Sequence, residues 1–135
     1  MAVWGIGSYY KGTLNPDKTD DFIKENCAFI GWDYDNAPSL HYMLSTVKLG
    51  DIVYIKSFIP KSKTLHIKAV GIVNDVNKNI SRELGTGIGV KWKDDFEPMK
   101  IEITEKVFKN NVYNNTLFEE YDAEIINKLI CELIK

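Results

Sequence analysis

Hydrophobic residues recur along the chain at two spacings, and these spacings predict strands and helices. Segments rich in β-branched and aromatic residues, partly alternating with polar ones, are each predicted to form a strand: 2–10, 27–32, 51–59, 64–75, 85–93 and 98–105. Segments with apolar residues at helical spacing are predicted to form helices: 19–26, 38–48 and 122–134. The pattern therefore predicts strands that mostly follow one another, with helices set apart from them.

Turn and capping residues define the ends of these elements. The segment 60–63 joins two strands into one hairpin, and 94–97 joins the last two into a second. Polar turns are predicted at 74–79 and 110–115. Asp122 can cap the C-terminal helix, whose apolar stripe is expected to pack on the sheet. Such a pattern indicates an α+β fold: a small, curved, mixed or antiparallel β-barrel with helices packed outside.

Composition limits what this fold can do. With 135 residues, 44% of them hydrophobic and 12% aromatic, the chain fits one compact domain over 1–135. It carries 17 Lys and Arg against 19 Asp and Glu, a formal charge of −2, which excludes general binding of polyanions. Any contact with nucleic acid must therefore be local.

Cysteine usage and the N-terminus narrow the class further. Cys27 and Cys131 have no Cys or His at metal-ligand spacing, so both are interpreted as buried thiols, and no metal or other cofactor is expected. The N-terminus has no basic region followed by an apolar one, and no stretch approaches about 18 uncharged apolar residues. We therefore expect a soluble, cytoplasmic protein with no membrane partner.

Aromatic residues gather at the ends of the predicted strands and in the loops that leave them: Trp4, Tyr9, Tyr10, Trp32, Tyr34, Phe58 and Trp92. Because strand ends surround the mouth of a barrel, these rings favour a pocket for a flat ligand such as a nucleobase. Stacking on aromatic rings stabilises a bound base by ~1–3 kcal/mol. The alternative, that the rings belong to the core, is equally supported for Trp4 and Trp92. Trp32 and Tyr34, which are flanked by Asp33 and Asp35, are better placed for the pocket.

Basic residues cluster around the tip of the first predicted hairpin. Lys56, Lys61, Lys63, His66 and Lys68 fall within 13 residues that contain no Asp or Glu. Such a group could follow a phosphate backbone. The equally supported alternative is that the lysines are solvated and protect an edge strand from aggregation.

A few groups could support acid–base chemistry, but their context favours structural roles. Asp33, Asp35, His41 and Asp51 lie close in sequence. Asp51 follows a glycine at a turn, where Asp usually accepts hydrogen bonds from backbone amides, and His41 lies on a helix. The glycine run at 85–89 lacks the Lys-Ser/Thr that follows a phosphate loop. No catalytic residue is assigned from these patterns.

Several short motifs, taken together, resemble a known family. They are a tryptophan on the first strand, Ile30-Gly31-Trp32-Asp33, an aliphatic helix, the segment Gly50-Asp51-Ile52-Val53-Tyr54-Ile55-Lys56-Ser57, and Ala69-Val70-Gly71-Ile72-Val73. Over roughly 2–107, the chain resembles the EVE domain of the PUA-like superfamily, which is related to YTH domains and to reader modules of modification-dependent restriction enzymes. The resemblance implies a small curved β-barrel over about 2–107, followed here by the C-terminal helix at about 121–134. It also implies recognition of a modified base that is flipped out of DNA or RNA into an aromatic cage.

The resemblance assigns roles to particular residues. Trp32 matches the family's stacking aromatic, Ser8 and Ser57 would hydrogen-bond the edge of the base, and Lys56 would meet a phosphate. The full expected ligand-binding set is Trp4, Ser8, Tyr9, Tyr10, Trp32, Asp33, Tyr34, Lys56, Ser57, Phe58 and Trp92, and the expected phosphate contacts are Lys61, Lys63 and Lys68. The single arginine and the acidic net charge disfavour strong binding to duplexes.

Two other classes of function stay open. Related barrels of the ASCH type resemble small hydrolases of modified nucleosides, in which case Lys56 or Asp33 would be the catalyst, and a lysine would need burial to lower its pKa. The chain could also be a protein-interaction or ligand-sequestering module in phage–host conflict, or form a homo-oligomer. The amphipathic C-terminal helix or an exposed aromatic patch would then mark the interface. Of these classes, a binding protein is favoured over an enzyme.

Overall fold

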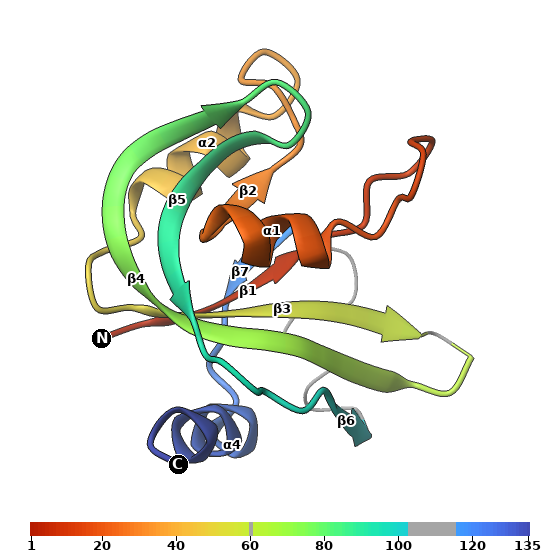
Figure 1. Ribbon diagram of the computed structural model, residues 1–135, viewed down its shortest axis with the longest axis vertical. Helices are drawn as coiled ribbons and strands as arrows, with labels where there is room; N and C mark the ends of the chain where they lie inside the picture. Colours follow the sequence, from red (N-terminus) through yellow and green to blue (C-terminus); the bar gives the residue numbers. More distant parts are fainter. Residues whose placement is uncertain (60, 103–115) are drawn as a thin grey trace.

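The computed structural model describes residues 1–59, 61–102 and 116–135, and over these residues the strands form one mixed sheet (Figure 1). The elements are β1 (Val3–Gly7), α1 (Thr19–Glu25), β2 (Cys27–Ile30), α2 (Pro38–Ser45), β3 (Ile52–Ile59), β4 (Thr64–Ser81), β5 (Gly85–Trp92), β6 (Met99–Glu102), β7 (Leu117–Glu119) and α4 (Ala123–Leu133). The strand order is β2-β5-β4-β3-β1-β7, with β6 paired to β4 off this path. β1 and β3 are parallel, and the other described pairs are antiparallel.

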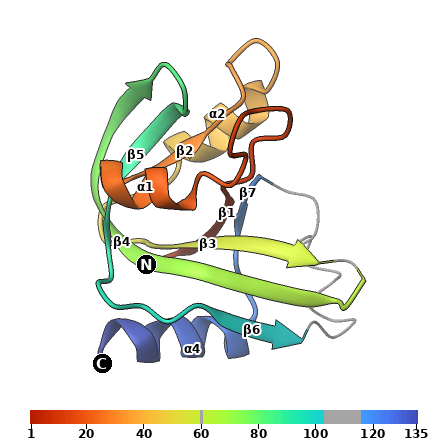
Figure 2. The same ribbon diagram turned by 45° about the vertical axis from the view of Figure 1, so that its right-hand side comes forward.

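One long strand bends the sheet into a half-barrel. β4 spans 18 residues, and its register against β5 shifts between Val73 and Asp75 and again between Asp75 and Asn79. Irregularities of this kind bend a strand and increase its twist. β4 and β5 accordingly curl together in the upper part of the view (Figures 1 and 2). The α+β class and the curved mixed sheet expected from the sequence are confirmed.

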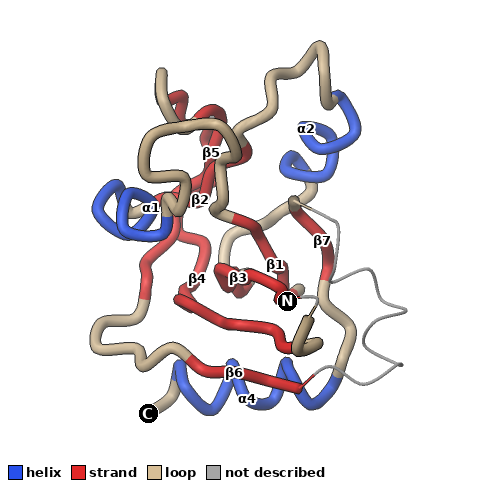
Figure 3. The backbone as a smooth tube through the Cα atoms, turned by 90° about the vertical axis from the view of Figure 1, so that its right-hand side faces the viewer, coloured by secondary structure: helices blue, strands red, loops and turns tan. Residues whose placement is uncertain are grey.

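The described helices flank this sheet on separate sides. α1 lies beside β2 and α2 beside β7, on opposite sides of the curled sheet, whereas α4 runs beneath β6 (Figure 3). Asp122 caps α4, as expected, by accepting a hydrogen bond from the backbone N–H of Ile125 at 3.1 Å. None of the described helices is long and apolar enough to cross a membrane.

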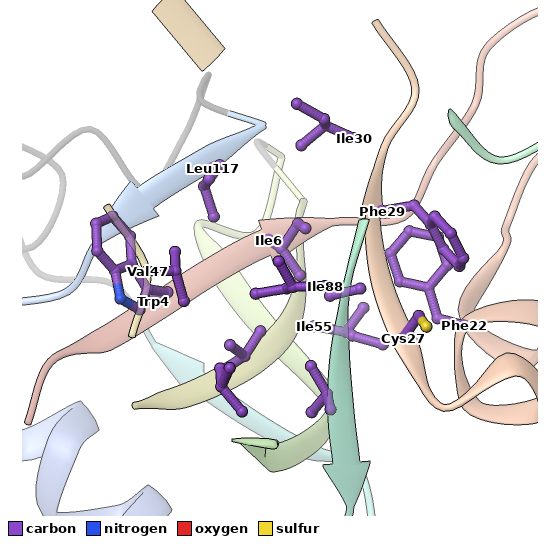
Figure 4. Close-up of a cluster of buried hydrophobic side chains, with 14 of the residues drawn as sticks. Trp4, Ile6, Phe22, Cys27, Phe29, Ile30, Val47, Ile55, Ile88 and Leu117 are labelled. Atoms are coloured by element: carbon purple, nitrogen blue, oxygen red, sulfur yellow. The ribbon is translucent and has the colours of Figure 1, made fainter. Parts of the chain in front are cut away.

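Alternation along β3 supplies two separate cores, because successive side chains of a strand point to opposite faces. Val53 and Ile55 belong to a core cluster with side chains of β1, β2 and β5. Figure 4 shows Ile55 inside the curled sheet. Ile52 and Tyr54 lie on the other face and pack with the apolar stripe of α4, which confirms the expected packing of that helix. A slip of one residue would exchange the two sets, so burial on both faces fixes the register of β3.

The predicted hairpin of 85–93 with 98–105 is wrong. β6 pairs with Thr64–Ile67 of β4, whereas β5 pairs with the later part of β4 from Gly71 onward. Both strands are antiparallel to β4, so they follow one another in the same direction along one of its edges. A β5–β6 hairpin would have left the first part of that edge unpaired, at the cost of several backbone hydrogen bonds.

The turn predicted at 74–79 is also wrong, since β4 continues through it. Asp75 does make the local hydrogen bond that favours a turn, by accepting from the N–H of Asn77 at 2.9 Å, but pairing with β5 absorbs this segment as an irregularity in the ladder. The sequence does not predict β7. The predicted strand end at 103–105 and polar break at 110–115 lie outside the described residues.

Candidate ligand-binding cavity

The parallel pairing of β1 with β3 brings the end of one strand against the middle of the other. Gly7 pairs with Lys56, so the residues that leave β1 meet the second half of β3. A cavity of about 910 Å³ lies at this junction. Its lining residues are Gly7, Ser8, Tyr9, Tyr10, Lys11, Thr13, Gly31, Trp32, Lys56, Ser57, Phe58 and Thr116. The volume falls within the range of about 300–1,000 Å³ that is typical of small-molecule sites.

Trp32 stands at the edge of the cavity on a loop that the chain holds in place. Its side chain is 56% exposed, and that of Tyr9, which also lines the cavity, is 65% exposed. The buried His41 of α2 donates from Nε2 to the carbonyl oxygen of Trp32 at 2.7 Å. Asp33 accepts a hydrogen bond from the N–H of Asn36 at 2.9 Å, which fixes the following turn. The cavity therefore has an exposed ring whose backbone is anchored.

Tyr10 is a fixed part of the wall. Its hydroxyl donates to the carbonyl oxygen of Leu84, and its ring packs edge-on against Phe22 with 6.2 Å between centroids. Gly31 permits this arrangement, because a Cβ there would lie 2.8 Å from the Tyr10 ring. Burial raises the pKa of Tyr10, so its phenol stays protonated near neutral pH. Since the hydroxyl is already engaged, the ring face is what Tyr10 offers a ligand.

Lys56 brings a basic group into this wall from β3. Its side chain is only 7% exposed, and its Nζ lies 5.4 Å from the centroid of the Phe118 ring. Burial, together with the nearby charge of Lys68, lowers the pKa of Lys56 to about 8. Among the described residues that line the cavity, Lys11 and Lys56 are basic and none is Asp or Glu. The described lining of the cavity is therefore aromatic and basic.

A network of polar side chains lies behind the cavity wall. Ser8 is fully buried, and its Oγ lies 2.9 Å from Thr19 Oγ1 and 3.4 Å from Asp17 Oδ1. Lys68 donates to Ser8 Oγ at 3.2 Å and forms an ion pair with Asp17 at 3.1 Å. Burial alone would raise the pKa of Asp17, but hydrogen bonds from Thr19 and the Lys68 ammonium lower it overall.

This network changes the roles assigned to two residues. Ser8 lines the cavity, but its hydroxyl is engaged with Asp17, Thr19 and Lys68, so we no longer assign it to the edge of a base. Lys68 is ion-paired and does not line the cavity, so we no longer assign it to a phosphate. Its effect is indirect, because its charge contributes to the lowered pKa of Lys56.

Two predicted pocket tryptophans are buried in the core and do not line this cavity. Trp92 donates from Nε1 to the carbonyl oxygens of Phe22 at 3.1 Å and Cys27 at 3.3 Å, and it does not line the cavity. Trp4 donates from Nε1 to Asp51 at 3.0 Å and lies in the interior of the curled sheet (Figure 4). It also borders a second hollow, beside α2. Both indole N–H groups donate to buried acceptors, and both rings are part of the core, which is the alternative interpretation of these tryptophans.

Several other predicted residues lie away from the cavity. Asp33 is used in its own turn, and Tyr34 borders a second hollow beside α2. Lys61 and Lys63 are exposed at the tip of the β3–β4 hairpin. Of the two cysteines, Cys27 is buried as expected, whereas the prediction for Cys131 is wrong because it is exposed.

The structural roles expected of Asp51 and His41 are confirmed. Asp51 accepts hydrogen bonds from Trp4 Nε1 and from the backbone N–H groups of Ala2 and Lys48 at 2.9–3.0 Å. Burial alone would raise its pKa, but these hydrogen bonds lower it overall. Neither residue lines the cavity.

Sequence reasoning missed the cavity residues that carry no pattern. Lys11 and Thr13 lie in an irregular loop without periodicity, and Thr116 precedes the unpredicted β7. The positioning role of His41 was missed for the same reason, since nothing in the sequence pairs it with the Trp32 carbonyl. Within the described part of the chain, no group of three or more His, Cys, Asp or Glu could hold a metal ion.

Comparison with models of known protein families and with curated proteins found no match to this chain. The function must therefore be inferred from the chemistry of the site.

Proposed function

We propose that this protein is an EVE-like, PUA-like binding module whose cavity takes a modified nucleobase, either within DNA or RNA or as a nucleotide. The observation that carries the proposal is the exposed Trp32 ring at the edge of a 910 Å³ cavity that also contains the buried Lys56. An anchored aromatic ring beside a polar recess is the arrangement that flat heterocycles require.

Each lining residue has a distinct part in this proposal. Trp32 stacks on the base, Tyr9 covers its outer side, and Tyr10 contributes a fixed wall. Lys56 and Ser57 are the polar side chains that reach the ligand from β3. Because the described lining holds two lysines and no carboxylate, the preferred ligand carries an anionic or hydrogen-bond-accepting substituent.

A binding screen tests this function. Oligonucleotides and free nucleotides, modified and unmodified, are titrated against the protein and against Trp32→Ala. Removal of a stacking ring that contributes ~1–3 kcal/mol predicts a drop in affinity of about 5- to 150-fold. Tyr42→Ala is the matched control, because Tyr42 is also an exposed aromatic residue but does not line this cavity. No binding of any modified ligand, or equal binding by Trp32→Ala, would reject the proposal.

A hydrolase of modified nucleosides is the second candidate, and the lowered pKa of Lys56 favours it. With a pKa of about 8, a fraction of Lys56 is a neutral amine near neutral pH. That amine could take a proton from water as the water oxygen attacks an acyl carbon. The bond from that carbon to the base nitrogen would then break, and the nitrogen would receive the proton from Lys56. Asp33, the other predicted catalyst, is not supported, since it does not line the cavity.

Product analysis separates this candidate from binding alone. N-acylated nucleosides are incubated with the protein and with Lys56→Met, and free nucleoside is followed by chromatography. Turnover that disappears in the variant supports catalysis. If the parent protein binds the nucleosides tightly but does not hydrolyse them, the hydrolase candidate is rejected and the cavity is a binding site only.

For the third class, a protein-interaction module, the amphipathic C-terminal helix was one expected interface. Ile125 and Leu129 on the apolar stripe of α4 are buried against the sheet, so this stripe is not available for a partner.

A further inference from the structure

A second hollow, of about 710 Å³, lies between α2, the end of β7 and the loop that follows β2. Three tyrosines from separate segments border it: Tyr34 from the loop after β2, Tyr42 from α2 and Tyr121 from the segment after β7. Their side chains are 65–74% exposed. Figure 3 shows how α2 and β7 come together at this side of the molecule. We refer to it as the tyrosine hollow.

The charge of the tyrosine hollow is opposite to that of the first cavity. Glu119, at the end of β7, is the only charged side chain among the described residues that line it. The interaction of the Tyr121 hydroxyl with the Glu119 carboxylate raises the pKa of Tyr121. Aromatic faces and a single carboxylate together attract an organic cation, through ring quadrupoles and direct charge.

The exposure of the tyrosines points to the source of such a cation. All three rings stay mostly solvent-exposed, so the tyrosine hollow is shallow and a small free ion would cover little of it. Exposed tyrosines that surround a charge-complementary recess are typical of the centre of a protein interface, where a partner covers them and excludes water.

We propose that the tyrosine hollow binds a lysine or arginine side chain of a partner protein. The cationic group lies against Tyr42 and Tyr121 and pairs with Glu119, and the partner's backbone covers Tyr34. This site is separate from the base-binding cavity, since no described residue lines both. The two proposals therefore stand or fall independently.

A peptide titration followed by NMR tests the site. The probes are short peptides with one central lysine, trimethyl-lysine or arginine between apolar residues. Their neutral counterparts carry norleucine or citrulline at the same position. We expect the cationic peptides to shift the ring signals of Tyr34, Tyr42 and Tyr121, and to bind at least fivefold more tightly than the neutral ones. A cation–π contact of about 1 kcal/mol corresponds to that ratio.

Variants identify the groups responsible. Tyr42→Ala and Glu119→Gln should each reduce affinity for the cationic peptides about fivefold, whereas Tyr9→Ala, at the other cavity, should leave it unchanged. Thermal unfolding checks that the variants are folded. Of Tyr42→Ala and Glu119→Gln, the former is less expected to disturb the fold, because Tyr42 is an exposed residue on a helix.

Several results would overturn the proposal. They are equal binding of norleucine or citrulline peptides, no binding of any cationic peptide at millimolar concentration, and shifts confined to Tyr9 and Trp32. A last arm compares choline with its neutral isostere 3,3-dimethylbutanol. Choline binding without peptide binding would overturn the partner protein in favour of a free organic cation.

Discussion

Lys56 is the side chain whose environment departs most from what its type prefers. Most lysines stay at the surface, yet Lys56 is buried beside an aromatic ring and lines a cavity. Burial disfavours its charged form, and the nearby charge of Lys68 adds to this effect, so its pKa falls from 10.5 to about 8. Burial of this charge therefore lowers the stability of the folded protein at neutral pH.

Replacing Lys56 with methionine should therefore stabilise the protein at neutral pH. The folded state disfavours the charged form, so between pH 8 and 10.5 it binds fewer protons than the unfolded state, and the free energy of unfolding rises with pH. Below about pH 8, the free energy of unfolding of Lys56→Met should exceed that of the parent protein by up to about 3 kcal/mol. Urea unfolding at pH 7 and 9.5 should show this gain shrinking to about half or less. A gain independent of pH would show that burial of the charge is not its cause.

His41 acts on the site through Trp32 and not through the ligand. Its Nε2 donates to the Trp32 carbonyl, and it does not line the cavity. His41→Ala should weaken ligand binding several-fold, whereas His41→Gln, whose amide N–H can replace Nε2, should restore most of it. Affinity and thermal stability are measured for both, with His66→Ala as control. If His41→Gln binds as weakly as His41→Ala although both are folded, the hydrogen bond does not position Trp32.

The sequence predicted those cavity residues that lie at or just beyond the ends of predicted strands. Tyr9 and Trp32 follow directly from the rule that aromatics leaving strands border a barrel mouth, and both line the cavity. The same rule failed for Trp92, because an indole N–H can find buried carbonyl oxygens that no sequence pattern reveals. It also misjudged Ser8, since the network that occupies its hydroxyl joins residues up to 60 positions apart.

The strands follow local patterns only where local and long-range pairing agree. β3 and the start of β4 form the predicted hairpin. β6 does not pair with its neighbour in sequence, because β2 and β4 already occupy both edges of β5, whereas Thr64–Ile67 of β4 is left for β6 to pair with. β7, with three residues, is too short for periodicity to reveal, and only its pairing with β1 defines it.

The glycines of β5 are explained by close approach of strands and not by phosphate binding. A Cβ on Gly87 would lie 2.4 Å from the carbonyl oxygen of Ala28 in β2, so Gly87→Ala must push the two strands apart. We expect a decrease of about 1–3 kcal/mol in the free energy of unfolding, measured by urea denaturation. Gly7→Ala is the matched control, because its nearest neighbour would lie at 3.9 Å. Equal decreases in the two variants would contradict this account of β5.

The protein combines a net charge of −2 with two hollows of opposite local charge. One is lined by lysines without a described carboxylate, and the other contains Glu119 as its one described charge. The net charge of the protein therefore says little about either site, since interactions between exposed charges more than about 8 Å apart are largely screened at physiological salt. A base reader with a separate protein-docking site would connect the recognition of a modified nucleic acid to a partner.

The lysines at the exposed hairpin tip provide a test of whether the proposed ligand is a free nucleotide or part of a strand. Lys61 follows Phe58, which lines the cavity, within at most about 10 Å of extended chain, so the tip can reach a neighbouring phosphate. If the base is read within a strand, Lys61→Ala with Lys63→Ala should weaken oligonucleotide binding. The slope of log K against log salt concentration should become shallower by about 0.7–0.9 for each phosphate that the protein no longer neutralises.

The same double variant should leave the affinity for a free modified nucleotide unchanged, whereas Trp32→Ala should weaken both ligands. Fluorescence titrations at several salt concentrations separate these cases. An unchanged salt slope for oligonucleotides would mean that the tip lysines are only solvated. The ligand would then be held within the cavity, where Lys11 and Lys56 are the lining cations. A free nucleotide would in that case be the better description of the ligand, because a strand passing the hairpin would meet the tip.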